Sequence, residues 1–259
     1  MPLTWSDKRK LYYAILIVLV MAAVGGVLAI PYITKPATCF DGKQNQGESG
    51  VDCSGPCQVI CPAEIRPPVL LWSRVFPVER GFWNAVAFVE NENANLGVEE
   101  TLYIFRLYDA NNIIITERKG RTYVGPNERF AIFEPRINVG SRIPTRVFFE
   151  FLSFSDWKRL GDIPKPTLFV RDQKLTDNAQ NTRLDVRLEN GTIVPVRDIE
   201  AVAILYDRSG NALAVSSTLV ETLPKESSRA LVFTWPKILS SDIARSEVLT
   251  RVNLFEFTF

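Results

Sequence analysis

Four cysteines are the residues of this chain whose type and spacing most clearly imply chemistry. They lie within one short stretch, at Cys39, Cys53, Cys57 and Cys61. In an oxidising compartment four neighbouring thiols most simply form two disulfides, and three pairings are open. A zinc site made of four thiolates is the alternative, but the paired Cys-x-x-Cys units of zinc ribbons are missing. The stretch therefore predicts two disulfides of open connectivity.

Oxygen-bearing side chains between the first two cysteines form a second candidate site. They are Asp41, Asn45, Glu48 and Asp52, and glycines separate them. Calcium takes six to eight oxygen ligands, and glycines allow a short loop to wrap around the ion. A solvated turn is the alternative, because Asp and Asn close turns on their own backbone and the spacing is not that of an EF-hand. We treat the four residues as candidate calcium ligands and expect no other cofactor.

Composition argues against most enzyme mechanisms. The chain of 259 residues contains no histidine, which removes the commonest general base, the usual zinc ligand and the Ser-His-Asp triad. Phosphate-cradling glycine motifs are also missing. A net charge of +1 offers no basic face for nucleic acid. We expect a non-enzymatic protein without a nucleic-acid partner or an identifiable small-molecule substrate. A carboxylate-dependent glycosidase is a distant alternative, since paired acids cannot be placed from the sequence.

The cysteine-rich stretch also resembles a known motif. The pattern runs Cys39-x-Asp41-Gly42-x-x-Asn45-x-x-Glu48-x-x-x-Asp52-Cys53-x-Gly55-x-Cys57. It is similar to a short cysteine motif that recurs in bacterial surface and exported proteins, where Asp-Cys-Gly-Gly is usual and Ser54 stands here for the first glycine. The resemblance implies an extracytoplasmic module and no catalysis.

An uncharged segment near the N-terminus predicts a membrane span. Residues 11–33 carry no charged side chain and follow the basic cluster Lys8, Arg9 and Lys10. A helix of about twenty residues crosses a hydrocarbon core of roughly 30 Å. By the positive-inside rule, the basic cluster predicts that residues 1–10 stay in the cytoplasm and that the rest of the chain is exported. A cleavable signal sequence is the alternative, but its apolar core is usually shorter. We expect a cell-membrane protein with its N-terminus inside and the lipid bilayer as one partner.

The rest of the chain repeats itself. Leu107-Tyr108-Asp109 recurs 98 residues later as Leu205-Tyr206-Asp207. Near the end of each copy the offset of similar triplets grows, as Thr145-Arg146-Val147 matches Thr250-Arg251-Val252 and Phe149-Glu150-Phe151 matches Phe255-Glu256-Phe257. These pairs predict two copies of one unit, with a few residues inserted before the last strand of the second.

Each copy is rich in β-branched and aromatic residues, in short runs bounded by Gly, Pro, Asn and Asp. Six or seven strands in about 95 residues are typical of an immunoglobulin-like sandwich. The fold class that we predict is all-β, with two tandem sandwiches preceded by one transmembrane helix and a disulfide-rich segment. The final strand is expected to run over residues 248–259. Tryptophans 72, 83, 157 and 235 are expected in the cores or at the domain interface.

The Leu-Tyr-Asp motif can be interpreted as the end of a strand followed by a turn. A buried strand ends at Leu107 and Tyr108, and Asp109 opens a turn into the next strand, with Leu205, Tyr206 and Asp207 as the counterparts. Phe105-x-Leu107-Tyr108-Asp109 also resembles the signature of FxLYD-type β-sandwich domains, and the second copy has alanine at the phenylalanine position. The resemblance implies a sandwich found in membrane-tethered and secreted bacterial proteins.

These observations predict five segments. They are a cytoplasmic tail (1–10), a transmembrane helix (11–33), a cysteine-rich neck (34–64) and two sandwiches (65–157 and 158–259). We expect the protein to bind or scaffold a protein partner outside the cytoplasm. An accessory subunit of a membrane-embedded envelope, pilus or secretion assembly is the alternative, because Ala22, Ala23, Gly25 and Gly26 allow close packing of helices.

Overall fold

The computed structural model describes residues 5–33, 38–161, 164–178, 180–239 and 242–257. It divides into two compact units, Met1–Cys61 and Pro62–Phe259. In the first unit, α1 (Trp5–Ile33) contains one stretch, Arg9–Leu28, that is long and apolar enough to cross a membrane; a signal sequence would pass the same test. Its large apolar side chains, such as those of Leu16 and Val20, are exposed.

The first sandwich opens the second unit, after the short helix η1 (Pro62–Glu64). Its strands are β1 (Val69–Glu79), β2 (Phe82–Asn91), β3 (Leu96–Tyr108), β4 (Ile114–Val124), β5 (Glu128–Asn138), β6 (Arg146–Phe154) and β7 (Trp157–Arg159). One sheet has the order β1-β2-β5 and the other the order β4-β3-β6, with β7 also paired to β3. The strands pair antiparallel, as in immunoglobulin-like sandwiches.

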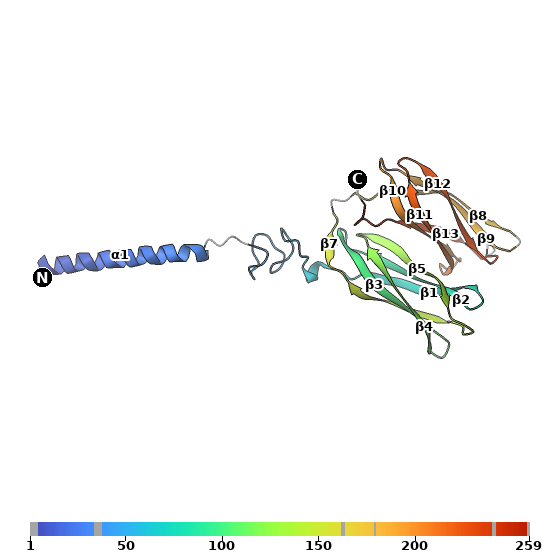
Figure 1. The fold of residues 1–259 in the computed structure, drawn as a ribbon, viewed down its shortest axis with the longest axis horizontal. Helices are drawn as coiled ribbons and strands as arrows, with labels where there is room; N and C mark the ends of the chain where they lie inside the picture. The colour runs from blue at the N-terminus through green and yellow to red at the C-terminus, as the bar shows by residue number, and fades with distance from the viewer. Residues whose placement is uncertain (1–4, 34–37, 162–163, 179, 240–241, 258–259) are drawn as a thin grey trace. The chain divides into compact units, whose positions relative to one another are not determined.

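The second sandwich repeats this arrangement. Its strands are β8 (Leu168–Asp177), β9 (Thr182–Asn190), β10 (Val196–Tyr206), β11 (Ala212–Leu223), β12 (Ser228–Trp235) and β13 (Arg245–Arg251). The sheets have the orders β12-β9-β8 and β11-β10-β13, which match those of the first copy strand for strand (Figure 1). The predicted fold class, two tandem β-sandwiches after one apolar helix and a disulfide-rich segment, is confirmed.

The predicted insertion in the second copy is wrong. Tyr108 pairs with Arg146 between β3 and β6, and Tyr206 pairs with Arg245 between β10 and β13. Arg146 therefore corresponds to Arg245, so the offset stays near 99 residues to the end of the repeat. The Thr-Arg-Val and Phe-Glu-Phe matches are chance similarities between strand-like segments.

The last strand is also shorter than predicted. β13 ends at Arg251, and the following residues turn instead of extending. Asn253 causes this turn, because its Oδ1 atom accepts a hydrogen bond from the Phe255 amide at 3.1 Å and its Nδ2 atom donates to Glu256 Oε1 at 2.9 Å. Residues 258–259 lie outside the described part of the chain.

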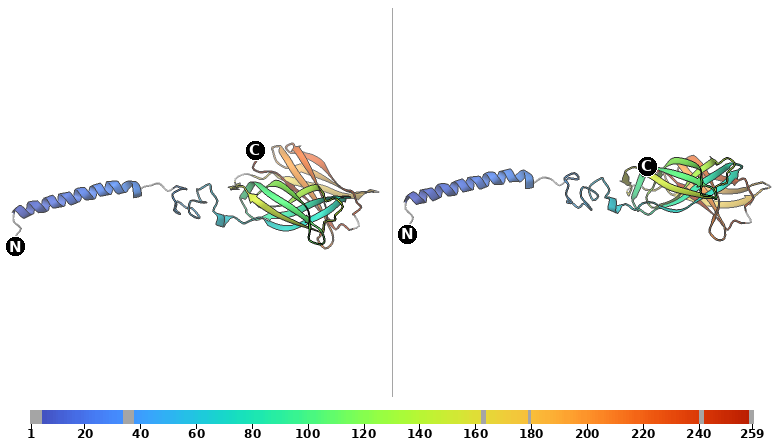
Figure 2. Two further views of the ribbon diagram at one scale, coloured as in Figure 1. Left: turned by 60° about the horizontal axis from the view of Figure 1, so that its bottom comes forward. Right: turned by 90° about the horizontal axis from the view of Figure 1, so that it is seen from below.

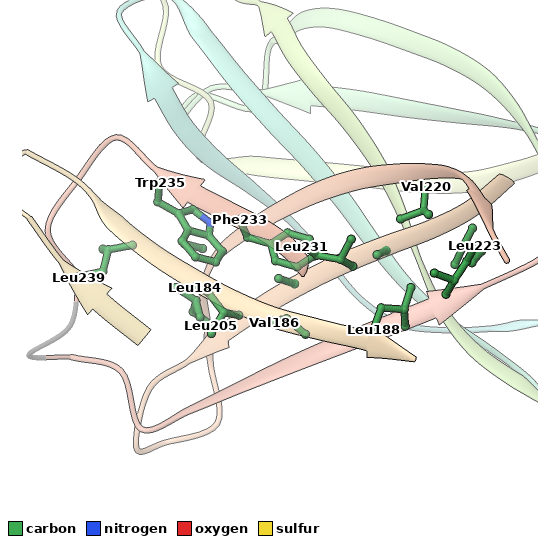
Figure 3. Close-up of a cluster of buried hydrophobic side chains, with 14 of the residues drawn as sticks. Leu184, Val186, Leu188, Leu205, Val220, Leu223, Leu231, Phe233, Trp235 and Leu239 are labelled. Atoms are coloured by element: carbon green, nitrogen blue, oxygen red, sulfur yellow. The ribbon is translucent and has the colours of Figure 1, made fainter. Parts of the chain in front are cut away.

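Each sandwich has its own apolar core. In the first, alternate residues of β2, β3 and β5 meet, including the fully buried Phe105. In the second, Leu184, Leu205 and Phe233 form the centre and Trp235 lies at the Leu239 end (Figure 3). As predicted, the tryptophans lie in or against buried clusters: Trp83 and Trp157 against the first core, Trp235 in the second, and Trp72 at the cluster described next.

A third apolar cluster joins the two sandwiches, which we call the junction. It takes the other faces of β1, β2 and β5 from the first sandwich and of β10, β11 and β13 from the second (Figures 1 and 2). Its central residues include Val86, Phe88, Val202 and Ile204. Each of the two inner sheets therefore packs on its own core with one face and on the other sandwich with the other, so the two sandwiches form a stack of four sheets.

The first sandwich extends slightly past the predicted boundary at residue 157. β7 pairs residues Trp157–Arg159 with Leu96–Val98 of β3. The Leu160 amide then donates to the carbonyl oxygen of Asn95 at 2.8 Å. The pairing of the first copy therefore continues through residue 160.

Candidate functional site

The neck, which the structure describes from residue 38 onward, is held by two overlapping disulfides. Cys39 is bonded to Cys57, and Cys53 is bonded to Cys61. Because Cys53 lies within the loop that the first bridge closes, the two loops overlap over residues 53–57. All four thiols are used, which leaves none for the zinc site that the sequence left open.

Glu48 organises the loop between the bridges. Its side chain is buried, and its Oε2 atom accepts hydrogen bonds from the backbone amides of Asn45 and Asp52 at 3.2 and 3.3 Å. Its Oε1 atom lies 3.0 Å from Cys57 Sγ and accepts a long hydrogen bond from Gln46. A buried carboxylate needs such partners to offset the loss of water. Glu48 thus connects the backbone at Asn45 and at Asp52 to the Cys39–Cys57 disulfide.

Two aspartates close the loop from outside. Asp52 accepts hydrogen bonds from the backbone amides of Asp41 and Gly42, each at 2.9 Å. Asp41 in turn accepts from Asn45 Nδ2 at 2.8 Å and from the Lys43 amide at 2.9 Å. The Asn45 side-chain amide, followed by the backbone amides of Lys43 and Thr38, holds the pKa of Asp41 below its ordinary value.

Three of the four candidate calcium ligands accept hydrogen bonds within the loop. The carboxylates of the candidate ligands Asp41, Glu48 and Asp52 face N–H groups of the loop, and their oxygens do not converge on a common point. Within the described residues, the ligand atoms that do come together are those of Cys39, Glu48 and Cys57, and both cysteines are in a disulfide. The Oδ1 atom of the fourth candidate, Asn45, is buried without a hydrogen-bond partner, and calcium binding stays a prediction that nothing here tests.

The backbone of the neck explains the glycine pattern of the motif. Gly55 has a φ of +60°, and a Cβ at this position would lie 2.3 Å from the carbonyl oxygen of Gly47. Ser54 also has a positive φ of 58°, which a glycine would adopt at lower cost. The buried Ser54 hydroxyl accepts a hydrogen bond from the Cys61 amide at 3.0 Å, a contact that glycine could not make. Serine in place of the first glycine of Asp-Cys-Gly-Gly thus adds backbone strain and gains one hydrogen bond.

The Leu-Tyr-Asp residues occupy corresponding places in the two sandwiches. Leu107 and Leu205 are fully buried. Asp109 accepts from the backbone amides of Asn111 and Ile113, and Asp207 accepts from those of Ser209 and Asn211. Tyr108 lies beneath the Arg146 guanidinium and Tyr206 beneath that of Arg245. The motif thus serves a strand end and a turn in both copies, and the two aspartates share no site.

A buried arginine between the two sandwiches is a structural feature that sequence reasoning missed. Arg251 of β13 is only 7% exposed. Its Nη2 atom donates to the Tyr123 carbonyl oxygen at 2.7 Å and to Glu128 Oε1 at 3.1 Å, and its Nη1 atom donates to Thr122 Oγ1 at 3.1 Å. Glu200 Oε2 lies 3.7 Å from Nη1. Every hydrogen bond named here crosses from the second sandwich to the first.

Aromatic rings and carboxylates together stabilise the positive charge of Arg251. The Arg251 guanidinium lies 3.8 Å from the ring centre of Tyr123 and 4.2 Å from that of Phe130. Burial opposes the charge, but Glu128, Tyr123 and Glu200 outweigh it and raise the pKa of Arg251. Burial also raises the pKa of Tyr123. Arg251 therefore remains a cation at every physiological pH.

Known proteins offer little beyond this geometry. No protein-family model and no curated protein matches the chain. Similar solved structures include an exo-chitosanase, CsxA, of Amycolatopsis orientalis (TM-score 0.28, 11% identity, 70% of this chain and 25% of that one). A red sea bream transglutaminase (0.22, 10%, 70% and 29%) and a β-glucuronidase from glycoside hydrolase family 2 (0.21, 9%, 66% and 24%) are others. This chain spans less than a third of each, and similarities at this level assign no activity to it.

Proposed function

We propose that this chain is a single-pass membrane protein whose two fused sandwiches form a rigid, non-enzymatic binding or scaffolding body outside the cytoplasm. The junction is the observation that carries the proposal. Two sheets that pack on both faces and the buried Arg251 fix one sandwich on the other. Fixed outer faces suit a protein that holds partners in a set geometry. A lone flexible domain would not need such a junction.

The membrane anchor and its orientation form the second part of the proposal. α1 is long and apolar enough to cross a bilayer, and Lys8, Arg9 and Lys10 at its start favour a cytoplasmic N-terminus. The two disulfides that follow support export, because such bridges persist in oxidising compartments. Retention of the helix as an anchor, rather than its cleavage, completes the proposed topology.

Crosslinking in the native membrane tests the binding role. Cells that express the full chain are treated with a short amine-reactive crosslinker, and the captured proteins are compared with those from cells expressing a variant with Arg251→Leu and Ile204→Ala, which weakens the junction. We expect the full chain to capture a reproducible set of partner proteins that the variant captures less well. Capture of the same partners in equal yield by both chains would show that a rigid junction is not needed and would contradict the proposal.

An accessory role in a membrane-embedded assembly is the second candidate. The observation in its favour is the pair of small residues Gly25 and Gly26 within α1. Small residues of this kind let a partner helix approach closely. Substituting both glycines by leucine and measuring co-purification in detergent separates the candidates. Loss of a partner favours the assembly role, and unchanged co-purification leaves α1 as an anchor.

A further inference from the structure

β6 is an edge strand of the first sandwich. In the part of the chain that the structure describes, it pairs with β3 alone. Phe148 and Leu152 point away from the core and are 46% and 44% exposed. β1 approaches the edge through one hydrogen bond, from Ser73 Oγ to the Val147 carbonyl oxygen at 3.2 Å, and forms no ladder with it.

Three other edge strands of this protein carry devices that block pairing with another chain. β4 is lined with charges in the run Glu117–Arg121, β1 contains Pro77, and β8 has a register irregularity between Arg171 and Lys174. Charges, prolines and bulges are the usual protections of a sheet edge. β6, with the sequence RVFFEFLSF, has no proline and no glycine, and its pairing with β3 is regular from Arg146 to Phe151. An apolar, regular edge of this kind is a template for strand addition.

The charges on β6 specify which strand would complement it. Arg146 and Glu150 lie on the same outer face, on either side of Phe148. Arg146 has no carboxylate partner among the described residues, and Glu150 is bound to Arg106 at 2.6 Å. If a second β6 strand pairs antiparallel with Phe148 at the centre, each Arg146 faces the Glu150 of the other copy. Opposite charges in facing positions stabilise antiparallel pairs.

An alternative register is less favourable. Pairing centred on Glu150 would place two carboxylates opposite each other, and like charges in facing positions are destabilising. It would also have to cross the irregularity at Leu152, where the regular pairing of β6 with β3 is interrupted. Both effects leave the arrangement centred on Phe148 as the preferred one.

We propose that β6 is a self-association edge, at which two copies of this chain pair antiparallel about Phe148 to form one continuous sheet. The partner is a second copy of this chain, since β6 itself supplies the complementary charges. Each end of the shared strand pair then carries one Arg146 facing one Glu150, with the two Phe148 rings between them.

Disulfide trapping tests this pairing directly. Facing Cβ atoms in antiparallel strands are about 4.5–5.5 Å apart, close enough for a disulfide after a small adjustment. Because all four native cysteines are bridged, Phe148→Cys introduces the one free thiol of the chain. Full-length F148C is oxidised in native membranes and analysed on non-reducing gels. We expect a crosslinked dimer as the main product.

Leu152→Cys is the matched control, because Leu152 is exposed to a similar extent on the same strand. In the proposed register the new thiols of two L152C chains would lie about 27 Å apart, at roughly 3.4 Å per residue, and should not crosslink. Equal crosslinking of F148C and L152C, or a dominant crosslink between F148C and L152C chains when the two are co-expressed, would overturn the proposal.

A charge exchange adds a second test. In the F148C background, Arg146→Glu should lower the crosslinked fraction about tenfold, because two attractive pairs become repulsive. Adding Glu150→Arg to R146E should restore it, since the pairs are then reversed but again opposite in sign. Recovery by the double variant could not come from a merely damaged fold. A crosslinked fraction that neither R146E nor the double variant changes would overturn the self-association edge.

Discussion

Arg251 of the second sandwich donates a hydrogen bond of 3.1 Å to Glu128 of the first, inside the junction between them. This contact brings together residues 123 positions apart in the chain. A buried ion pair need not stabilise a protein more than apolar residues would, but losing one partner leaves an uncompensated charge. Arg251 and Glu128 therefore make the relative placement of the sandwiches specific.

The first prediction concerns this pair. Arg251→Leu should destabilise the full chain by about 3 kcal/mol, because it strands the largely buried Glu128 carboxylate and removes the cross-junction bonds. The measurement is urea denaturation followed by tryptophan fluorescence. Arg245→Leu on the same strand is the control, and its exposed pair with Glu247 should cost less than about 1 kcal/mol. Equal effects of the two variants would mean that the junction does not depend on Arg251.

The second prediction concerns the apolar part of the junction. Ile204 is fully buried on the face of β10 that meets the first sandwich. Ile204→Ala should cost about 3 kcal/mol, and both sandwiches should still unfold in one transition, because each buries a sheet face against the other. Calorimetry on the full chain gives both quantities. Ile193→Ala, at a residue that is 76% exposed, is the control and should change little. Two separate transitions in the unsubstituted chain would contradict a fused body.

The third prediction concerns the glycines of the neck. Gly55→Ala should prevent correct formation of the two bridges, because the new Cβ would lie 2.3 Å from the Gly47 carbonyl oxygen. Gly42→Ala is the matched control, since Gly42 also has a positive φ but open space around it. Its cost should be the backbone strain alone, about 1 kcal/mol. Non-reducing peptide mapping counts the native bridges in each variant. Native pairing in G55A at the level of G42A would refute this view of the neck.

The fourth prediction is a pH dependence. The pKa of Asp109 is held below its ordinary value by the Ile113 backbone amide, the Arg142 guanidinium and the Asn111 backbone amide. The Asn211 backbone amide lowers the pKa of Asp207 in the same way. A carboxyl group whose pKa is lowered by folding contributes stability that is present above its unfolded pKa and is lost as the pH falls through the folded value. Stability should therefore decline below about pH 4.

Asparagine at both positions isolates this effect, because its side chain still closes the turns but carries no charge. The variant with Asp109→Asn and Asp207→Asn should lose less stability than the original chain between about pH 4 and pH 2. The measurement is the melting temperature across this range, with salt concentration held constant. Parallel curves for the two proteins would exclude these aspartates as a source of acid sensitivity.

The parts of the fold that could be predicted are those that local sequence patterns specify. The repeat of Leu-Tyr-Asp, the turn residues around Asp109 and Asp207 and the uncharged run of α1 are local patterns, and they predicted the sandwiches and the apolar helix. The end of the repeat was misplaced because similar triplets, such as those around Arg146 and Arg251, do not carry register. Register depends on pairing with a distant strand, which the sequence does not display.

The junction had a readable signal that sequence reasoning did not use. The runs Ala85–Val89 in β2 and Ala201–Tyr206 in β10 are continuously apolar, whereas a strand with one solvated face alternates. Such runs indicate burial on both faces and hence a second layer. The role of Arg251 had no such signal, because its partners Thr122, Tyr123 and Glu128 come from the other repeat. In the neck, the turn alternative named backbone hydrogen bonds for Asp and Asn in general, but only the fold showed that Asp52 accepts from the amides of Asp41 and Gly42, 11 and 10 residues earlier.

The location of the sandwiches is the central claim and can be measured directly. Intact, sealed cells that express the full chain with a C-terminal epitope are treated with a protease, before and after lysis, and a cytoplasmic protein is monitored as an internal control. The account predicts that the epitope is lost from intact cells while the cytoplasmic control survives. An epitope that survives in intact cells and is digested only after lysis, in cells without an outer barrier to the protease, would contradict the proposed export.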